Sequence, residues 1–221
     1  MNIIDALLQR KSARAFLDKP VDREKIERIL RAARHAPSGT NAQPWQVAVV
    51  SGKKKEELTR ILSEAFQQNG PGVMDYQYYP IDWHEPYKSR RVACGAQLYT
   101  ALGIDRRDKE RRLAQWAANY RAFGAPVILF FFLDPVMQKG SFLDYGMFLQ
   151  SVMLAAQEEG LATCAQAALG QYPQLIKDFL GYSRDTTLIC GMALGYEDKE
   201  APVNHYRTPR EEVVVFTRFF E

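Results

Sequence analysis

Three side chains near the start of the chain, Arg10, Ser12 and Arg14, have the types and the spacing to bind a phosphate. In an extended segment, alternate side chains point to the same face, so the two guanidiniums would flank the hydroxyl group. A guanidinium presents a planar fork of donors that matches phosphate oxygens. Two further arginines, Arg207 and Arg210, lie near the other end of the chain, and the same anion would account for them. An exposed basic strand without a ligand is the alternative.

A second group of polar side chains occupies the segment 36–46, between a charged amphipathic run and a β-branched run. Pro37 disfavours a helical conformation at the residue before it, and Ser38, Gly39 and Asn41 are turn formers. A loop that only connects a helix to a strand needs few of these groups. We therefore interpret the segment as a loop whose polar groups face a flat, heteroatom-rich ligand, with a merely connective loop as the alternative.

Aromatic residues gather in the segment 68–88, which is also interrupted by glycine and proline. Tyr76, Tyr78, Tyr79, Trp83 and Tyr87 all fall within it. Loops of this composition form lids or pocket walls for flat molecules, because aromatic rings offer large faces for stacking. A hydrophobic plug over the core explains the segment equally well at this stage.

Several other functional classes are excluded by the sequence. The three histidines and three cysteines are isolated and show no metal-ligand spacing, so no metal site is expected. Neither a Walker-type loop nor a Gly-x-Gly-x-x-Gly turn after a strand is present, so a nicotinamide would not be held in a Rossmann crevice. No convincing Ser–His–Asp set occurs, and no catalytic side chain is nominated.

Charge and hydropathy indicate an ordinary soluble protein. The formal net charge of +3 is too small to indicate nucleic acid or a membrane surface as a partner. No stretch approaches the roughly 18 to 20 apolar residues of a membrane-spanning helix. The first five residues lack the pattern of a signal peptide, so a cytoplasmic location is expected. The cysteines are expected to be reduced and mostly buried.

These side chains must be positioned by a set of helices and strands that the apolar periodicity predicts. Helices are expected at 2–9, 22–33, from 52 to the late sixties, 88–103, 105–122, 141–159 and 173–180. Strands are expected at 45–50, 127–133 and 186–194, the second of these covered on both faces because it is wholly apolar. The helix near 142–156 carries only Asp144 as a charge and is expected to be central and buried, with Ser141 and Asp144 forming a capping box.

Several of these segments resemble motifs of the nitroreductase family of FMN-dependent flavoproteins. The resemblance rests on Arg10–Arg14, the Pro37–Trp45 loop, Gly160–Cys164, Gly191–Tyr196, and Pro202–Asn204 with the arginines that follow. It spans nearly the whole chain in the right order. It implies an NAD(P)H-dependent oxidoreductase that passes hydride through FMN by a ping-pong scheme to nitroaromatic or quinone-like acceptors. The segment Tyr78–Tyr87 resembles the same segment in a subgroup that acts on nitrobenzene- and nitrobenzoate-like compounds. The resemblance leaves open which electron acceptor this protein uses.

The resemblance also implies where FMN and the second subunit lie. FMN would sit at a homodimer interface, with ligands from both protomers. Arg14 would reach the N1/C2-carbonyl edge, and the backbone at 168–170 would donate to N5. The resemblance implies that Arg10, Ser12 and Arg14 come from one protomer and Pro37, Ser38, Gly39 and Asn41 from the other. The remaining implied FMN-binding residues are Lys11, Ala168, Leu169, Gly170, Arg207 and Arg210.

The expected fold is a single α+β domain over residues 1–221, a nitroreductase-like sandwich with a mixed sheet of four or five strands flanked by helices. Residues from about 196 to 221 would form an extended C-terminal arm. Its apolar run Val213–Phe216 is expected to be a strand exchanged with a partner's sheet, because a free apolar edge would promote aggregation. Three alternatives share the FMN frame: a reductive dehalogenase of halotyrosines, a flavin-fragmenting enzyme, and a protein that binds FMN without turnover.

Overall fold

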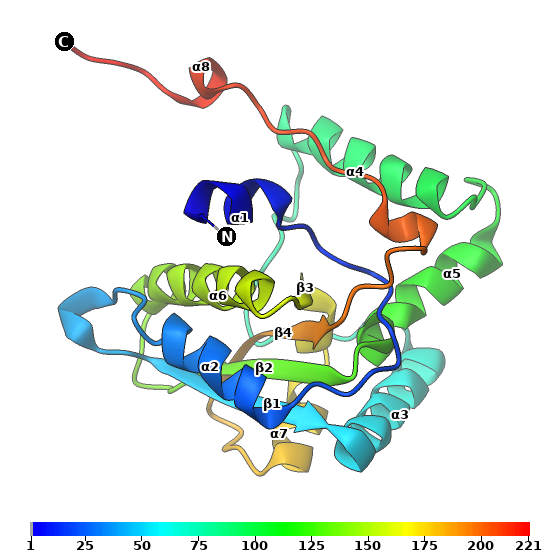
Figure 1. The fold of residues 1–221 in the computed structure, drawn as a ribbon. Coiled ribbons are helices and arrows are strands. Elements are labelled where there is room, and N and C mark those ends of the chain that lie inside the picture. Colours follow the sequence, from blue (N-terminus) through cyan, green and yellow to red (C-terminus); the bar gives the residue numbers. More distant parts are fainter. Residues whose placement is uncertain (1) are drawn as a thin grey trace.

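The computed structural model describes residues 2–221, which form a four-stranded sheet with helices on both faces (Figure 1). The strands are β1 (Trp45–Ser51), β2 (Val127–Leu133), β3 (Ala162–Gln166) and β4 (Thr187–Gly195), in the spatial order β1-β2-β4-β3. The α+β class is confirmed, but the expected mixed sheet is corrected, because all three strand pairings are antiparallel. An apolar sequence indicates that a strand is covered on both faces. It does not indicate whether the strand pairs with its neighbours in a parallel or an antiparallel direction.

The described residues form twelve helical segments besides this sheet. The α-helices are α1 (Ile3–Gln9), α2 (Arg23–Ala33), α3 (Gly52–Asn69), α4 (Tyr87–Ala101), α5 (Lys109–Ala117), α6 (Gly140–Glu158), α7 (Pro173–Leu180) and α8 (Val213–Phe216). The 3₁₀ segments are η1 (Gly39–Asn41), η2 (Ala118–Gly124), η3 (Ala167–Gly170) and η4 (Pro202–Asn204). The predicted helices are confirmed, although the span predicted at 105–122 divides into α5 and η2.

The central strand β2 separates two hydrophobic cores. All of its residues are buried, as its apolar sequence predicts. Successive side chains of a strand point to opposite faces. Leu129 and Phe131 therefore pack against α2 and α6, whereas Phe130 and Phe132 pack against α3 and α7. The sheet thus carries one core on the face of α2 and α6 and a second core on the face of α3 and α7.

Helix α6 departs from its predicted cap and from full burial. It begins at Gly140, so Ser141 lies inside the helix and does not cap it. Asp144 accepts a hydrogen bond from the backbone N–H of Gly39 instead, at 3.2 Å, and so ties the helix to the 36–46 loop. Tyr145 and Phe148 are buried against the sheet, but Leu143 on another face is 73% exposed. The nearly uncharged helix is therefore not fully buried within its own chain.

Two segments differ from the sequence-based expectation. Residues 162–166 form strand β3 at the edge of the sheet beside β4, and this strand was not among those predicted. Val213–Phe216 forms a short helical turn and not a strand. Within one chain this segment has no neighbouring strand to pair with, and Val215 N–H bonds locally to Glu212 O at 2.9 Å. The arm that carries it runs past α4 and away from the body of the molecule (Figure 1).

Among the helices of residues 2–221, none combines the length and the apolar character that crossing a bilayer demands.

Candidate functional site

A basic cavity of about 290 Å³ lies where the N-terminal segment meets the C-terminal arm. Five cationic side chains line it, and no carboxylate does. Its lining residues are Leu7, Leu8, Arg10, Lys11, Ser12, Arg14, Cys94, Val203, Asn204, Tyr206, Arg207, Thr208 and Arg210. The four predicted arginines from the two ends of the chain are therefore brought together, as the sequence indicated.

The N-terminal wall of this cavity is extended and anchored to the sheet. Ser12 forms a parallel bridge to Thr163 at the edge of β3, and Ala13 N–H bonds to Thr163 O at 3.0 Å. Asn204, which is 1% exposed, fixes the same segment from the other side. Its Oδ1 accepts the Arg14 N–H at 2.8 Å, and its Nδ2 donates to Ala15 O at 2.9 Å. The backbone that presents the arginines is thus held on both sides.

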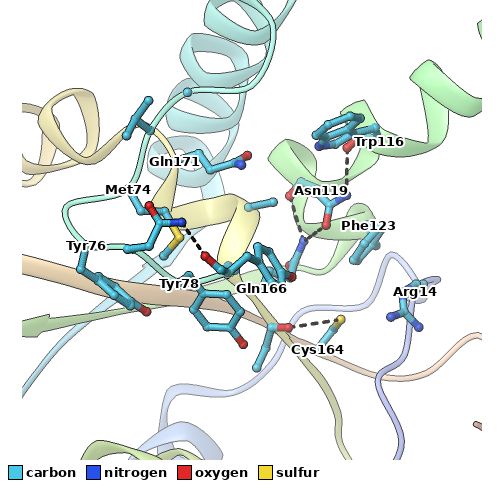
Figure 2. A pocket seen from close by; sticks show the side chains of 17 residues that line it. Arg14, Met74, Tyr76, Tyr78, Trp116, Asn119, Phe123, Cys164, Gln166 and Gln171 are labelled. Atoms are coloured by element: carbon cyan, nitrogen blue, oxygen red, sulfur yellow. Dashed lines mark hydrogen bonds between the residues drawn. The ribbon is translucent and has the colours of Figure 1, made fainter. Parts of the chain in front are cut away.

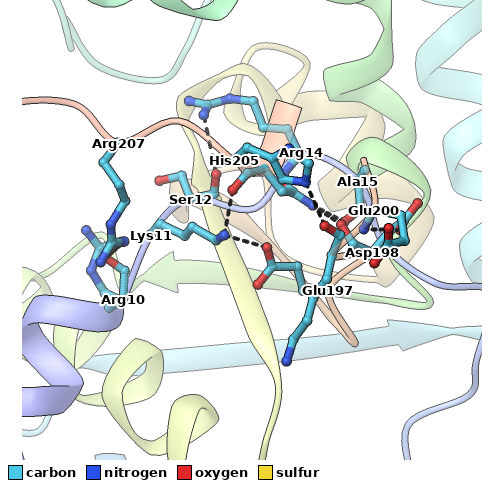
Figure 3. Close-up of polar contacts among 12 residues, drawn as sticks. Arg10, Lys11, Ser12, Arg14, Ala15, Glu197, Asp198, Glu200, His205 and Arg207 are labelled. Carbon is cyan, nitrogen blue, oxygen red and sulfur yellow. Dashed lines mark hydrogen bonds and ion pairs between the residues drawn. The ribbon is translucent and has the colours of Figure 1, made fainter. Parts of the chain in front are cut away.

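The Lys11 side chain is engaged within the protein (Figure 3). Its Nζ lies 2.6 Å from Glu197 Oε1 and donates to Asn204 O at 2.5 Å. These contacts join the N-terminal segment to the start of the arm. The ammonium group of Lys11 therefore joins the two segments, and the predicted part of Lys11 in binding FMN stays a prediction.

The arginines of the cavity are close enough to affect one another. Arg207 Nη1 donates to Arg10 O at 2.9 Å, and its Nη2 donates to Leu8 O. Arg210 bonds only to its own turn, at Thr208 and Pro209. Burial, together with the charges of Arg210 and Arg207, lowers the pKa of Arg10. Like charges gathered without a carboxylate among the lining residues fit a site for an anion.

An aromatic cavity of about 480 Å³ adjoins the basic cavity and shares Arg14 with it (Figure 2). One wall comes from the segment that follows α3 and includes Tyr76, Tyr78 and Tyr79. Opposite this wall, α5 and η2 contribute Trp116, Asn119 and Phe123, and the end of β3 with η3 supplies the floor. The floor residues and the remaining wall residues are Gly72, Val73, Met74, Gln77, Cys164, Ala165, Gln166, Ala167, Ala168 and Gln171. Tyr76, Tyr78 and Tyr79 therefore form a cavity wall, as one of the two interpretations expected, whereas Trp83 and Tyr87 do not line the cavity.

The floor of the aromatic cavity carries a polar atom without a partner. Gln166 Nε2 donates to Asn119 O and to Asn119 Oδ1, both at 3.1 Å, which fixes the orientation of the amide. Its Oε1 is buried and has no hydrogen-bond partner. Of the predicted backbone donors, Ala168 lines the cavity, whereas Leu169 is buried beneath it and Gly170 packs against Met74.

The predicted loop residues Pro37, Ser38, Gly39 and Asn41 line neither cavity in the single chain. The loop is nevertheless well organised, since Gln43 N–H bonds to Ser38 Oγ at 3.0 Å. Thr40, Asn41 and Gln43 all have positive φ, between 49° and 59°, a conformation that non-glycine residues rarely adopt. Backbone strain of this kind is concentrated at binding sites.

Sequence reasoning did not assign a site role to several lining residues. Asn204 and Tyr206 sit beside the recognised arginines, and the Tyr206 hydroxyl accepts a bond from Arg14 Nη1 at 3.2 Å. Trp116 and Asn119 belong to α5 and η2, which were identified only as elements. The amphipathic pattern of α5 could not show which part of it faces a cavity.

The two cavities together have the character of an FMN site. The basic cavity supplies cations for a phosphate, and the aromatic cavity supplies a flat apolar wall with amide groups for a ring system. The unpartnered Gln166 Oε1 fits a ligand with a hydrogen-bond donor in the aromatic cavity, and the arginines without a carboxylate beside them fit an anionic group in the basic cavity. Among the described residues, no group of three or more His, Cys, Asp or Glu side chains is arranged to hold a metal ion.

Comparison with known proteins gives the same answer. The model of the Nitroreductase family matches residues 7–196. A 4-nitrobenzoate reductase of Pseudomonas putida is 40% identical over 95% of this chain and 92% of its own. A nitrobenzene nitroreductase of Ectopseudomonas oleovorans is 37% identical, over 98% and 96% of the two chains. The crystal structure of the FMN and NADPH-dependent nitroreductase NfnB from sphigopyxis sp. strain HMH superposes with a TM-score of 0.97 at 40% identity, covering all of both chains. The chain described here therefore belongs to the nitroreductase family.

Proposed function

We propose that the protein is an FMN-dependent oxidoreductase that uses NADH or NADPH to reduce small nitroaromatic or quinone-like acceptors. The observation that carries this proposal is the junction of the two cavities at Arg14. A cluster of cations without a carboxylate among its lining residues opens directly onto an aromatic-walled space. That is the arrangement needed for a cofactor with a phosphate at one end and a flat ring at the other. The names of the relatives at 37 and 40% identity support nitroaromatic acceptors in particular.

The phosphate would be held by Arg10, Arg207 and Arg210, with the Ser12 hydroxyl beside them. Arg14 would approach the N1/C2-carbonyl edge of the ring, because it is the cation that belongs to both cavities. The backbone at Ala168–Gly170 would offer an N–H toward N5. Lys11 would serve the site by holding the 10–14 segment against Glu197.

FMN, when bound, supplies the electron transfer from NAD(P)H to the acceptor. The protein binds FMN, orients its ring toward the donor and the acceptor, and tunes the reduction potential of the ring. A cation at the pyrimidine edge stabilises negative charge on the reduced ring and so favours its formation. The aromatic wall would stack with planar donor and acceptor molecules in turn, which agrees with a ping-pong order. No side-chain nucleophile or acid–base pair is needed for this chemistry, and none is proposed.

We further propose a homodimer in which residues 37–41 of one protomer complete the site of the other. Three exposed apolar surfaces support this. Helix α1 exposes Ile3, Ile4 and Leu8, each at 64% or more, helix α6 exposes Leu143, and the arm exposes Val214 and Phe220. Strand β1 is an edge of the sheet with a free side that an exchanged arm could join. The free cysteines suit a reducing compartment, which supports the cytoplasm as location.

The test begins with the purified protein. A yellow protein that releases FMN on heating, and that oxidises NADPH or NADH when 4-nitrobenzoate or nitrobenzene is added, supports the proposal. Parallel lines in double-reciprocal plots at several acceptor concentrations would support the ping-pong order. A colourless protein that cannot be reconstituted with FMN would contradict it.

The same assay separates the alternatives. Turnover of a halotyrosine in preference to a nitroaromatic would indicate the dehalogenase. Loss of the flavin itself under oxygen would indicate the flavin-fragmenting enzyme, and bound FMN without turnover would indicate a store or sensor. The similarity to reductases of nitroaromatic compounds makes these alternatives less well supported.

A further inference from the structure

The segment that follows α3, residues 70–76, runs as a strap past the start of β4, where β3 does not pair, and is fastened at several points along its length. At its start, Gly70 O accepts a hydrogen bond from the Tyr172 hydroxyl. At its end, the Tyr76 hydroxyl donates to Ile189 O at 2.8 Å. Between these points Gly72 lies so close to the chain that a Cβ atom there would be 2.1 Å from Gln171 O. The strap therefore follows one path across η3, α7 and β4.

A buried ion pair holds the strap at its centre. Asp75 Oδ2 lies 2.8 Å from Lys177 Nζ and accepts the Leu188 N–H at 2.8 Å. Lys177 Nζ also donates to Arg184 O at 3.0 Å. The Lys177 side chain is 1% exposed and that of Asp75 is 16% exposed. A buried ammonium group is costly unless it is paired, so Lys177 strongly favours the position in which Asp75 reaches it.

The position of this ion pair within the strap connects it to the aromatic cavity. Met74 and Tyr76 flank Asp75, and both line the cavity, as does Tyr78 two residues further on. The carboxylate held at Lys177 therefore fixes the backbone from which its two neighbours, Met74 and Tyr76, reach the cavity.

Resting on the proposed function, we propose that Lys177 and Asp75 are positioning residues for the acceptor. The pair fixes the wall formed by Met74, Tyr76 and Tyr78 at a set distance from the floor of the cavity. The ion pair contacts neither the acceptor nor the cofactor. By fixing this wall, it helps to decide which aromatic acceptors bind productively. The wall on this side is a fixed part of the site, because residues 70–76 are bonded to the rest of the chain at both ends and at Asp75.

The first test is the variant Asp75→Asn, which keeps an acceptor for the Leu188 N–H and removes the charge. In Asp75→Asn the ammonium group of Lys177 loses its charged partner. The double variant Asp75→Asn with Lys177→Met removes this group as well, and methionine has nearly the same volume as lysine. In both, we expect the ratio of kcat/KM for 4-nitrobenzoate and nitrobenzene to change by about fivefold or more, chiefly through KM. The affinity for FMN and the rate of flavin reduction by NADPH should stay within about twofold.

The same corner of the molecule offers a matched control. Arg184 Nη2 pairs with Asp178 Oδ2 at 2.7 Å, but with side chains 72% and 47% exposed, and neither residue belongs to the strap. Asp178→Asn removes the same charge from α7 and should leave the acceptor ratio unchanged. A general effect of charge or helix stability would change both variants alike, and that result would overturn the proposal.

A second measurement does not depend on turnover. Hydrogen exchange of peptides covering residues 70–79, in protein without FMN, should be faster in Asp75→Asn than in the native chain and unchanged in Asp178→Asn. If the native protein reduces no nitroaromatic, the proposed function fails, while the exchange data still decide whether the pair orders the strap. An Asp75→Asn variant with native exchange and a native acceptor ratio would refute the positioning role.

A milder variant covers the case in which Asp75→Asn does not fold. Tyr76→Phe removes only the hydroxyl that bonds to Ile189 O. It should speed exchange of the same peptides and shift the acceptor ratio in the same direction by a smaller factor. An unchanged ratio together with faster exchange would show that the order of the strap does not control the acceptor, and the proposal would then be abandoned.

Discussion

Replacing Asn204 with alanine gives the sharpest test of how the site is held together. The side chain makes three hydrogen bonds that join two distant parts of the chain. Its Oδ1 accepts Arg14 N–H at 2.8 Å, and its Nδ2 donates to Ala15 O at 2.9 Å and to Asp198 O at 2.8 Å. Alanine would leave all three backbone groups without these partners, at a residue that is 1% exposed in the native protein.

The expected loss comes mainly from two of these groups, because Ala15 O also accepts the Asp198 N–H at 3.2 Å and keeps that partner. A buried donor or acceptor left unsatisfied costs about 1 to 3 kcal/mol. Water can reach partly buried backbone groups, which places each cost near the lower end of that range, so the total loss of unfolding free energy should be about 2 kcal/mol. The Arg14 backbone also loses its fixed position, so the affinity for FMN should fall together with stability.

Urea unfolding of the FMN-free protein measures this loss, with native and variant chains compared at one protein concentration because a dimer's stability depends on it. Asn69→Ala is a matched control, since Asn69 makes one exposed bond, from Nδ2 to Ala65 O at 3.2 Å. Its change should stay within about 0.5 kcal/mol. A loss of less than about 1 kcal/mol in Asn204→Ala, with unchanged FMN affinity, would refute the assigned clamp.

The other predictions concern the cofactor, the arm and the thiols. Arg207→Ala should weaken FMN binding by about tenfold to a hundredfold, because a charge-assisted hydrogen bond contributes about 1.5 to 3 kcal/mol. Fluorescence titration measures the affinity, and a variant with native affinity would contradict the proposed site. Truncation before Ala201 should give a chain that neither binds FMN, as measured by absorption, nor forms a stable dimer, as measured by gel filtration. A truncated chain that stayed dimeric and yellow would exclude the exchanged arm. Burial raises the pKa of Cys190 to about 12, so a thiol reagent at mild pH should modify exposed Cys94 first in the FMN-free protein. FMN should slow that reaction, because Cys94 lines the basic cavity; equal rates with and without FMN would place the cofactor elsewhere.

The elements with strong periodicity were predictable from the sequence. Helix α7 begins and ends where its pattern indicated, and β2 has the burial on both faces that its apolar run implied. Strand β3 was missed because its sequence, Ala-Thr-Cys-Ala-Gln, lacks the large β-branched and aromatic residues that mark strands. The segment 213–216 has those residues and forms a helical turn, because strand formation needs a partner that its own chain does not provide.

For the candidate site, the arginines could be found because a cation is conspicuous in a sequence. Buried polar residues whose partners are distant in sequence could not be recognised in this way. Lys177 falls in an amphipathic helix, where a lysine is normally solvated, and its partner Asp75 lies about a hundred residues away in sequence. Only the folded chain shows that this ammonium group faces inward. The same reason hid the role of Gln166, whose amide is oriented by Asn119.

The division of the interior by β2 has a consequence for how this enzyme family can diversify. The side chains that pack toward α3 and α7 include those beneath the floor of the aromatic cavity, whereas those that pack toward α2 and α6 form the other core. A substitution in β2 on one side meets none of the atoms packed on the other side. Changes in free energy from positions that share no contacting residue should therefore add. Tyr76 of the cavity wall links the two sides, because its ring packs against Phe142 of α6 with the ring centroids 4.8 Å apart, so a change of that wall would also reach α6.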